Sequence, residues 1–286
     1  MRIHDGSLLR VNDDVKDFHR DYDEHVRDIS SFLHAKGLRL NTDLGQHFLQ
    51  DEGVLHAIVE AAKIDPSDHI VEIGAGVGVL TKELTGKAKQ VTAVELDRRL
   101  IDLLKEYTGN PSNLTIVEGN ALQVPLPESP YKIVANIPYH ITSPLLRHAF
   151  LESSTYPKSM TLLIQREVAE KICDQKDHGL LTILVSLFGT PRVVRIVHPG
   201  AFIPPPKVDS AVLHIECFPK PKADPKTIDE LFVLTKAAFS QKRKMLRNTI
   251  GEMERGMERL GEAGIDPTRR PQTLNIDEWI KLAQTT

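Results

Sequence analysis

The sequence of 286 residues is poor in cysteine and tryptophan, and it contains no long apolar run. Its two cysteines, Cys173 and Cys217, lie far apart and outside any CxxC pattern. This spacing argues against a disulfide scaffold or a zinc site and favours reduced core thiols. A transmembrane helix needs about eighteen consecutive apolar residues, and no such run occurs. Because residues 1–6 also lack the apolar region of a secretory signal, we expect a cytoplasmic protein with no membrane partner.

The chain also has no large excess of positive or of negative charge. The net charge is -3, and 26% of the residues are charged, as in an ordinary globular protein. Basic residues nonetheless form one compact cluster, on a helix that we predict over residues 242–251: Lys242, Arg243, Lys244 and Arg247. A looser group contains Arg192, Arg195, His198 and Lys207. Such clusters are either solvated surface or a grip for a phosphate backbone, and the sequence alone leaves both interpretations open.

A strand, a glycine-rich loop and a helix are predicted in succession over residues 69–84. The loop has the spacing GxGxG, from Gly74 through Gly76 to Gly78, whereas a dinucleotide-binding loop has GxGxxG. Val79 stands where the last glycine of that motif would be, so there is no sign of a close pyrophosphate approach. A cofactor without phosphate, such as S-adenosylmethionine, suits the loop better. Gly74 and Gly76 would let the backbone approach the methionyl part of such a cofactor.

Polar residues follow the next two predicted strands, over residues 90–94 and 114–117. Glu95 comes about twenty residues after the loop, where a carboxylate can accept both hydroxyls of a ribose. The alternative is an exposed acidic start of a helix. Asn120 carries the donor and acceptor needed at the edge of an adenine ring. Because parallel strands end at one edge of a sheet, these residues predict a single cofactor site.

The stretch Asn136-Ile137-Pro138-Tyr139 follows a predicted buried strand over residues 132–135. Pro138 ends the strand, because it lacks a backbone donor and fixes φ. Asn136 then presents acceptor oxygens beside the ring of Tyr139, an arrangement that suits an adenine lifted out of its stack. The alternative is a turn whose tyrosine fills the core.

Phe202 precedes three consecutive prolines, which predict a stiff and extended loop. If this loop folds over the Asn136 corner, Phe202 stacks on the target ring from the side opposite Tyr139. The alternative is burial of Phe202 between the loop and the core.

Composition divides the chain into three parts: an extension over residues 1–36, a catalytic domain over residues 37–218 and a helical domain over residues 219–286. The extension is acidic, with a possible helix over residues 15–33, and its histidines do not have the spacing of metal ligands, so we expect no metal site. Residues 179–187 are ambiguous between helix and strand. Pro–Lys alternation over residues 218–222 predicts a linker. Helices are expected beyond it over residues 227–239, 242–251 and 252–260, and from residue 276.

The motifs GQHFL, VEIGAGVGVLT, VELD, GNAL, NIPY, PGAFIPPPKVDSAV and AFSQKRKMLRNTI occur in this order. In this respect the chain from about residue 36 onward resembles the ribosomal RNA adenine N6-dimethyltransferases of the small-subunit type. The resemblance implies a class I S-adenosylmethionine-dependent α/β fold, with a mostly parallel seven-stranded sheet, an antiparallel last strand and C-terminal helices. It also implies dimethylation of two adjacent adenosines in the 3′-terminal hairpin of 16S ribosomal RNA. The expected partner is an immature 30S particle, bound by a monomer with a role in ribosome biogenesis.

Roles for individual residues follow from the same resemblance. It implies that His47 and Leu49 line the methionine end of the cofactor with Gly74 beside it, where the glycine loop itself also predicts Gly76. Glu95 would bind the ribose and Asn120 the cofactor's adenine. Asn136 and Tyr139 would position the target base and Phe202 would close over it, and Asn136 is also expected to contact the cofactor. The charge of the basic cluster, Lys242, Arg243, Lys244 and Arg247, separately predicts that it binds the RNA. The family commonly has aspartate at position 120, so asparagine there predicts weaker cofactor binding rather than lost activity.

Three other functions remain open at this point. A large-subunit RNA adenine methyltransferase of the macrolide-resistance type also carries NIPY, although PPPKVDSAV and the C-terminal helices favour the small-subunit type. A non-catalytic ribosome-assembly factor is a second alternative, which the intact loop and NIPY corner disfavour. A nicotinamide dehydrogenase is disfavoured by the glycine spacing.

Overall fold

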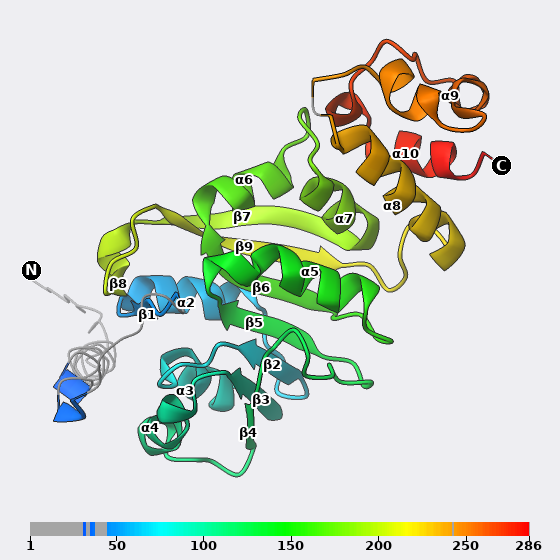
Figure 1. Ribbon diagram of the computed structural model, residues 1–286. Helices are drawn as coiled ribbons and strands as arrows, with labels where there is room; N and C mark the ends of the chain where they lie inside the picture. The colour runs from blue at the N-terminus through cyan, green and yellow to red at the C-terminus, as the bar shows by residue number, and fades with distance from the viewer. Residues whose placement is uncertain (1–30, 33–34, 38–44, 242, 286) are drawn as a thin grey trace, which may run out of the picture.

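A seven-stranded sheet with helices on both faces forms the body of the computed structural model, which describes residues 31–32, 35–37, 45–241 and 243–285 (Figure 1). The strand order is β4-β3-β2-β5-β6-β9-β7. The strands are β2 (His69–Ile73), β3 (Gln90–Glu95), β4 (Leu114–Glu118), β5 (Lys132–Asn136), β6 (Ser159–Gln165), β7 (Gly189–Val197) and β9 (Ser210–Cys217). Strand β9 runs antiparallel to both of its neighbours, β6 and β7, and the other pairs of this sheet are parallel. The predicted α/β class with an antiparallel last strand is confirmed, whereas the helix predicted over residues 15–33 lies largely outside the described residues.

Alternation of side chains along the strands buries both faces of the sheet. Met160, Leu162 and Ile164 of β6 pack on one face, and Leu163 packs on the other. Such two-sided burial is typical of parallel sheets and explains the continuous apolar runs of these strands. The first face is covered by α5 (Thr142–Leu151), α6 (Arg166–Cys173) and α7 (Leu180–Phe188). The second is covered by α2 (Glu52–Ala61), α3 (Val79–Thr85) and α4 (Arg98–Thr108).

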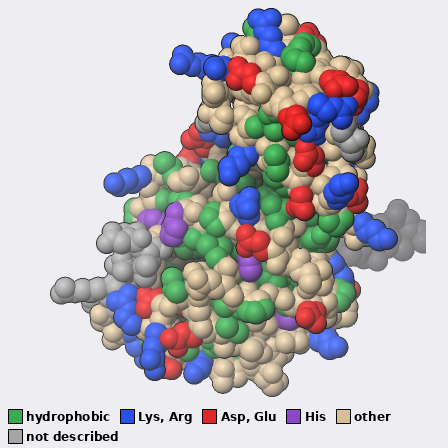
Figure 2. All heavy atoms as spheres, turned by 45° about the vertical axis from the view of Figure 1, so that its right-hand side comes forward, with side chains coloured by type: hydrophobic (Ala, Val, Ile, Leu, Met, Phe, Trp, Pro, Cys, Tyr) green, Lys and Arg blue, Asp and Glu red, His purple; other side chains and the backbone are tan. Residues whose placement is uncertain are grey.

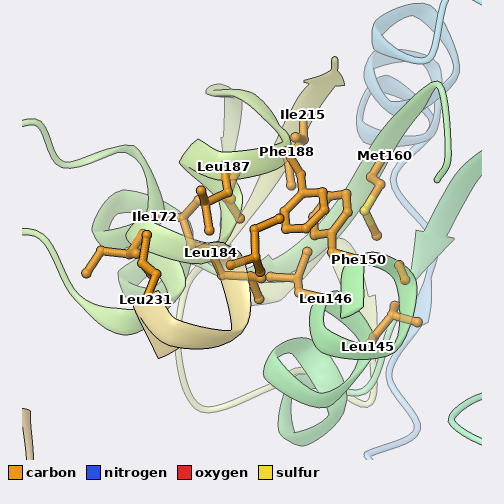
Figure 3. Packing of buried hydrophobic residues seen from close by; sticks show 14 of the residues in the cluster. Leu145, Leu146, Phe150, Met160, Ile172, Leu184, Leu187, Phe188, Ile215 and Leu231 are labelled. Carbon is orange, nitrogen blue, oxygen red and sulfur yellow. The ribbon is translucent and has the colours of Figure 1, made fainter. Parts of the chain in front are cut away.

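The ambiguous segment over residues 179–187 is a helix, α7, in the structure. Gly179 starts it by donating its backbone N–H to Thr182 Oγ1. The ring of Phe188 then stacks on that of Phe150 of α5, with ring centroids 4.8 Å apart (Figure 3). Packing of an apolar helix face on the sheet, rather than strand pairing, therefore decides the conformation.

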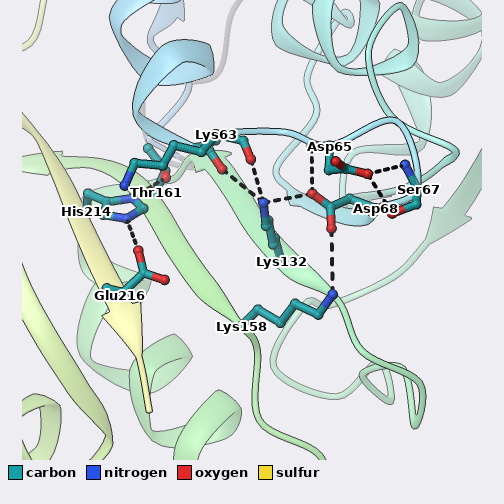
Figure 4. Close-up of polar contacts among 10 residues, drawn as sticks. Lys63, Asp65, Ser67, Asp68, Lys132, Lys158, Thr161, His214 and Glu216 are labelled. Atoms are coloured by element: carbon teal, nitrogen blue, oxygen red, sulfur yellow. Dashed lines mark hydrogen bonds and ion pairs between the residues drawn. The ribbon is translucent and has the colours of Figure 1, made fainter. Parts of the chain in front are cut away.

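A small network of ion pairs lies at the amino ends of the strands. Lys132 Nζ lies 2.7 Å from Asp68 Oδ2 and also donates to the Lys63 carbonyl, while Lys158 Nζ lies 3.8 Å from Asp68 Oδ1 (Figure 4). Asp68 is buried, and the two lysines offset the cost of removing its carboxylate from water. This network ties the start of β2 to the start of β5, on the edge opposite the loops that follow the two strands.

The C-terminal helices α8 (Pro225–Phe239), α9 (Gly256–Ala263) and α10 (Ile276–Ala283) pack together beside α7 (Figure 1). Trp279 of α10 is fully buried, and the centroid of its ring lies 6.2 Å from that of Phe239. None of the helices in the described ranges has the length and apolarity required to cross a membrane.

The prediction of a helix over residues 242–251 is wrong. Among the described residues, this segment forms only a turn and two short 3₁₀ helices, η4 (Leu246–Asn248) and η5 (Ile250–Glu252). The backbone N–H of Leu246 donates to the Arg269 carbonyl and that of Arg247 to the Pro267 carbonyl, so neither is available to a helix. Burial of Leu246 and Ile250 secures these tertiary bonds.

The helix predicted over residues 252–260 begins later, at Gly256. A Cβ atom at Gly256 would lie 1.8 Å from the Ile250 carbonyl oxygen, so only glycine fits where the chain doubles back.

We predict that Leu246→Ala lowers the free energy of unfolding by about 2–5 kcal/mol, because it leaves a cavity in a closed core. The neighbouring and partly exposed Met245 is the control, and Met245→Ala should cost under about 1.5 kcal/mol. Urea unfolding followed by circular dichroism measures both. An equal loss of unfolding free energy in the two variants would contradict the description of this segment as an anchored turn.

Candidate functional site

Two corners of the chain meet at the carboxyl ends of β2 and β5, where the strand order reverses direction. Gly74 follows β2 with φ +72°, and its N–H donates to the Val94 carbonyl. A Cβ atom at Gly74 would lie 3.5 Å from Pro138 Cδ and 3.7 Å from the Asn136 carbonyl oxygen. The structure thus brings the glycine turn directly against the NIPY corner, at the position where open α/β sheets bind ligands.

Asn136, the last residue of β5, has its amide fixed by the chain segment that crosses above it. Asn136 Nδ2 donates to the His47 carbonyl, 3.1 Å away. Because the nitrogen is used in this way, the amide oxygen Oδ1 is left as an acceptor. Asn136 lines a cavity of about 140 Å³ together with Gly74 and Tyr139.

Tyr139 begins the short 3₁₀ helix η2 (Tyr139–Ile141). Its ring lies nearly parallel to that of His47, with centroids 6.1 Å apart and 21° between the ring planes. Its hydroxyl lies 2.6 Å from Ser210 Oγ, and burial raises the pKa of Tyr139, so the hydroxyl is protonated at neutral pH. His47 Nδ1 lies 2.7 Å from the Pro204 carbonyl; a carbonyl only accepts, so Nδ1 carries the proton.

The GQHFL segment crosses the cavity and connects its two sides. Strand β1 (Phe48–Leu49) pairs with β8 (Phe202–Ile203) in a separate two-stranded sheet. Gln46 Nε2 donates to Asp97 Oδ2 at 2.8 Å, on the opposite side. Phe48 covers the glycine loop: a Cβ atom at Gly76 would lie 2.7 Å from Phe48 Cε1. Gly76 is therefore required for this aromatic cover as well as for its own positive φ.

Phe202 does not take the predicted position. Its side chain is 2% exposed, packs with Leu49, Val134 and Val212, and does not line the cavity. The reason is strand pairing: the register Leu49↔Phe202 directs the ring into the core before the three prolines begin. The alternative interpretation, burial between the loop and the core, describes the structure.

Glu95 lies at the rim of the same cavity. Glu95 Oε2 accepts the Gly76 N–H at 2.7 Å and Oε1 accepts the Asp97 N–H at 2.8 Å. Burial raises the pKa of Glu95, and these backbone donors oppose the rise. Each oxygen keeps a second lone pair, so the carboxylate can still accept from the two hydroxyls of a ribose.

The cavity wall near Glu95 also contains Asn120 and Leu96. Asn120 Oδ1 accepts the Leu122 N–H at 3.0 Å, which fixes the amide at the cavity rim. Leu96 is 58% exposed, although most of the leucines that the structure describes are buried. Sequence reasoning missed Leu96, because a leucine between two acidic residues gives no signal of its own. Its apolar surface beside an amide fits a flat heterocycle.

A second residue that sequence reasoning missed is Glu72 of β2. It is 1% exposed and lines the cavity, and its Oε2 atom has no hydrogen-bond partner. Burial raises the pKa of Glu72 to about 8. The available signal was one acidic residue in an otherwise apolar strand end, VEI. Below that pKa the carboxyl is protonated, and a bound cofactor that carries positive charge, such as S-adenosylmethionine, would lower the pKa and favour the carboxylate.

Of the basic residues predicted to bind RNA, Arg243 and Lys244 lie on the turn before η4 and Arg247 lies in η4, and none of the three lines this cavity. Arg243, Lys244 and Arg247 are exposed, and Lys242 lies outside the described residues. In the looser group, Arg195 Nη1 donates to the Gly53 carbonyl and His198 Nδ1 lies 3.1 Å from Asp209 Oδ1, so both have structural partners.

A larger groove, of about 1150 Å³, lies between α5, α7 and α8, and Figure 2 shows hydrophobic side chains mixed with basic and acidic ones on this part of the molecule. Arg147, Lys222 and Phe232 are among the residues that line it. None of the candidate cofactor or target-base residues lines this groove, so the smaller cavity at the strand ends is the better candidate site.

We predict that Glu72→Gln flattens the pH dependence of stability in the cofactor-free protein. The pKa of Glu72 is raised from 4.5 to about 8 by burial, so the folded state binds this proton more tightly than the unfolded state. The stability contribution is present at low pH and is lost as pH rises from about 4.5 toward about 8. Urea unfolding at pH 5.5 and pH 8 measures it. If the free energy of unfolding falls equally between these two pH values in the wild type and in Glu72→Gln, the raised pKa of Glu72 is contradicted.

Comparison with known proteins gives the following similarities. The family model described as ribosomal RNA adenine dimethylase matches residues 37–286. A protein of Clostridium botulinum named ribosomal RNA small subunit methyltransferase A is 40% identical over 260 residues, which are 86% of this chain and 93% of that protein. The protein of the same name from Dehalococcoides mccartyi is 41% identical over 257 residues, 86% of this chain and 88% of that protein.

Two solved structures are similar over most of the chain. A dimethyladenosine transferase from Plasmodium falciparum is 29% identical with a TM-score of 0.72, and the match covers 82% of this chain and 96% of that one. The 23S rRNA methyltransferase ErmE is 26% identical with a TM-score of 0.66, and the match covers 83% and 98% of the two chains.

Proposed function

The chain belongs to the ribosomal RNA adenine dimethylase family, and on this premise we propose that it dimethylates the N6 atoms of adenosines in small-subunit ribosomal RNA. The observation that carries the proposal is the meeting of the Asn136 amide, the Tyr139 ring and the Gly74 turn at one end of the sheet. The protein is a methyltransferase, and S-adenosylmethionine supplies the methyl group on a positively charged sulfur.

The choice of the small subunit rests on the relatives of 40% and 41% identity, which are named for that subunit. The similarity to the large-subunit enzyme ErmE is lower, at 26%. We infer that the targets are two adjacent adenosines of the 3′-terminal hairpin, in an immature 30S particle in the cytoplasm, and that the protein acts as a monomer. An unpaired hairpin loop suits the site, because its bases unstack at little cost.

The cofactor residues proposed from the sequence keep their roles in this proposal. His47, Leu49, Gly74 and Gly76 surround the methionyl part, and Glu95 and Asn120 bind the ribose and adenine. Glu72 and Leu96 join them, since both line the same cavity. Asn120 offers one acceptor oxygen where an aspartate would offer two, so we expect weaker cofactor binding than in relatives with aspartate.

Asn136 is proposed to activate the target nitrogen. The exocyclic nitrogen of adenine is a poor nucleophile, because its lone pair is delocalised into the ring. The Asn136 Oδ1 atom accepts a hydrogen bond from the amino group and offsets the positive charge that develops on the nitrogen as the N–C bond forms. The S–C bond of the methyl donor would break in the same step and leave neutral S-adenosylhomocysteine. The proton of the alkylated nitrogen then leaves to water. Tyr139 stacks on the base and holds it for in-line attack, which we expect to be the larger effect.

We predict that Asn136→Ala lowers the turnover number by about 10²-fold or more, because it removes one preorganised acceptor. Affinity for S-adenosylmethionine, measured by calorimetry, should change little. Asn113→Ala is the matched control: that amide donates to the carbonyls of Thr85 and Ala88 at the opposite end of the strands. Near-normal turnover in Asn136→Ala would remove the proposed role.

The activity itself is tested with radiolabelled S-adenosylmethionine and undermethylated 30S subunits, followed by digestion of the RNA to nucleosides. Labelled N6,N6-dimethyladenosine at the 3′-terminal hairpin supports the proposal. Label in large-subunit RNA would support the resistance-type alternative, and binding without label would support a non-catalytic assembly factor.

The C-terminal segment over residues 219–286 is proposed to bind RNA through Lys242, Arg243, Lys244 and Arg247, and residues 37–218 to carry catalysis. The extension over residues 1–36 has no proposed role. Arg243 and Lys244 are exposed on an anchored turn and Arg247 on the short 3₁₀ helix η4 that follows it, rather than on the face of an α-helix. An anchored turn presents cations to phosphate with little loss of backbone entropy on binding.

We predict that Arg243→Glu with Lys244→Glu weakens binding to 30S subunits. The slope of log affinity against log salt should fall by about 1 for each phosphate that the variant no longer neutralises. The control reverses two exposed lysines at the amino ends of the strands, Lys87→Glu with Lys89→Glu. Filter binding between 50 and 200 mM salt, about the range in which such ionic interactions act, measures both. If both double variants bind alike, the turn does not bind RNA.

A further inference from the structure

We propose that Ser210 is a positioning residue for the methyl transfer, acting through the hydroxyl of Tyr139; this rests on the proposed role of Tyr139 in holding the target base. Tyr139 and Ser210 are 71 residues apart in the chain, and their hydroxyl oxygens lie 2.6 Å apart. Both hydroxyls can donate and accept, so either serves as the donor. The bond links the target-base corner to the start of β9.

Ser210 is a rigid anchor because it is held on both sides. It is the first residue of β9, and it pairs with Gln165 of β6 and with Val197 of β7. Its side chain is fully buried. The preceding residue is also fixed, since the Asp209 carbonyl accepts the Arg166 N–H at 3.0 Å. The Ser210 oxygen therefore has a defined place that a surface side chain lacks.

Tyr139 needs such an anchor because the hydrogen bonds of its backbone do not restrain the ring. It follows Pro138 in a single 3₁₀ turn, and its side chain is only half-buried at the cavity. Its carbonyl accepts both the backbone N–H and the Oγ1 hydroxyl of Thr142, and neither of these bonds restrains the ring. The ring itself rotates about two single bonds. A hydrogen bond at the far end of the ring fixes both rotations together.

The same loop restrains the second ring of the site. The Pro204 carbonyl accepts from His47 Nδ1, and Ser210 bonds to Tyr139, so the two ends of residues 204–210 hold the two nearly parallel rings. The proline-rich loop thus contributes to the site without its own aromatic residue, Phe202, which is buried. Its contribution is the orientation of rings from elsewhere in the chain.

The test is a double-mutant cycle of Ser210→Ala, Tyr139→Phe and the two together. Each single variant removes the same neutral hydrogen bond, so each should lower the turnover number by about 3- to 10-fold. The double variant should lose no more than either single one, because both substitutions remove the same interaction. Affinity for S-adenosylhomocysteine, measured by calorimetry, should stay within about 2-fold, since neither hydroxyl is proposed to touch the cofactor.

A readout other than activity uses an RNA hairpin with 2-aminopurine at the target position. Its fluorescence is quenched when the base stacks, so Ser210→Ala should reduce the quenching on binding in the presence of S-adenosylhomocysteine. The control is Ser159→Ala, a buried serine at the other end of the same β6–β9 pair. Ser159→Ala should leave both quenching and turnover as in the wild type.

Three results would overturn the inference. The first is a wild-type turnover number in Ser210→Ala. The second is a loss of turnover in the double variant that equals the product of the two single losses. The third is an equal loss in Ser159→Ala, which would indicate a general effect on the sheet. If Ser210→Ala does not fold, Tyr139→Phe still tests the bond, because it keeps the ring and removes only the hydroxyl. An inactive wild type would instead refute the proposed function.

Discussion

The contact between the glycine turn after β2 and the proline corner after β5 is the constraint on which the site depends. It follows from direct pairing of the two strands, Ile70 with Lys132 and Val71 with Ile133. Because the strands are parallel, both release their loops at the same edge. A Cβ atom at Gly74 would already be in van der Waals contact with Pro138, so the two corners lie directly against each other. The cofactor side and the target side of the cavity are therefore adjacent by topology.

The GQHFL segment crosses both corners and encloses them in one site. Its side chains and carbonyls contact Asp97 on one side and Asn136 on the other. Phe48 lies over the loop at Gly76, and β1 joins the segment to β8. A disturbance of this segment would therefore affect the methionyl part of the cofactor and the target amide together.

Much of this arrangement was predictable from local sequence patterns. The strands before Gly74 and Asn136 follow from apolar runs and from turn chemistry that act over a few residues. The register of β1 with β8 was not predictable, because it joins residues about 150 positions apart; it is the reason that Phe202 is buried. The turn at Leu246 depends on the Arg269 carbonyl in the same way. Glu72 differs again, since one acidic residue in a strand does not reveal that its carboxyl faces a cavity.

Trp279 has a practical consequence for experiments on this protein. It is the single tryptophan of the sequence, and it lies buried between α10 and α8. Intrinsic emission excited at the tryptophan band therefore originates in the C-terminal helices and not at the strand ends. Optical melting curves from this fluorophore describe loosening of the C-terminal helices, whereas changes at the catalytic cavity require a label placed there.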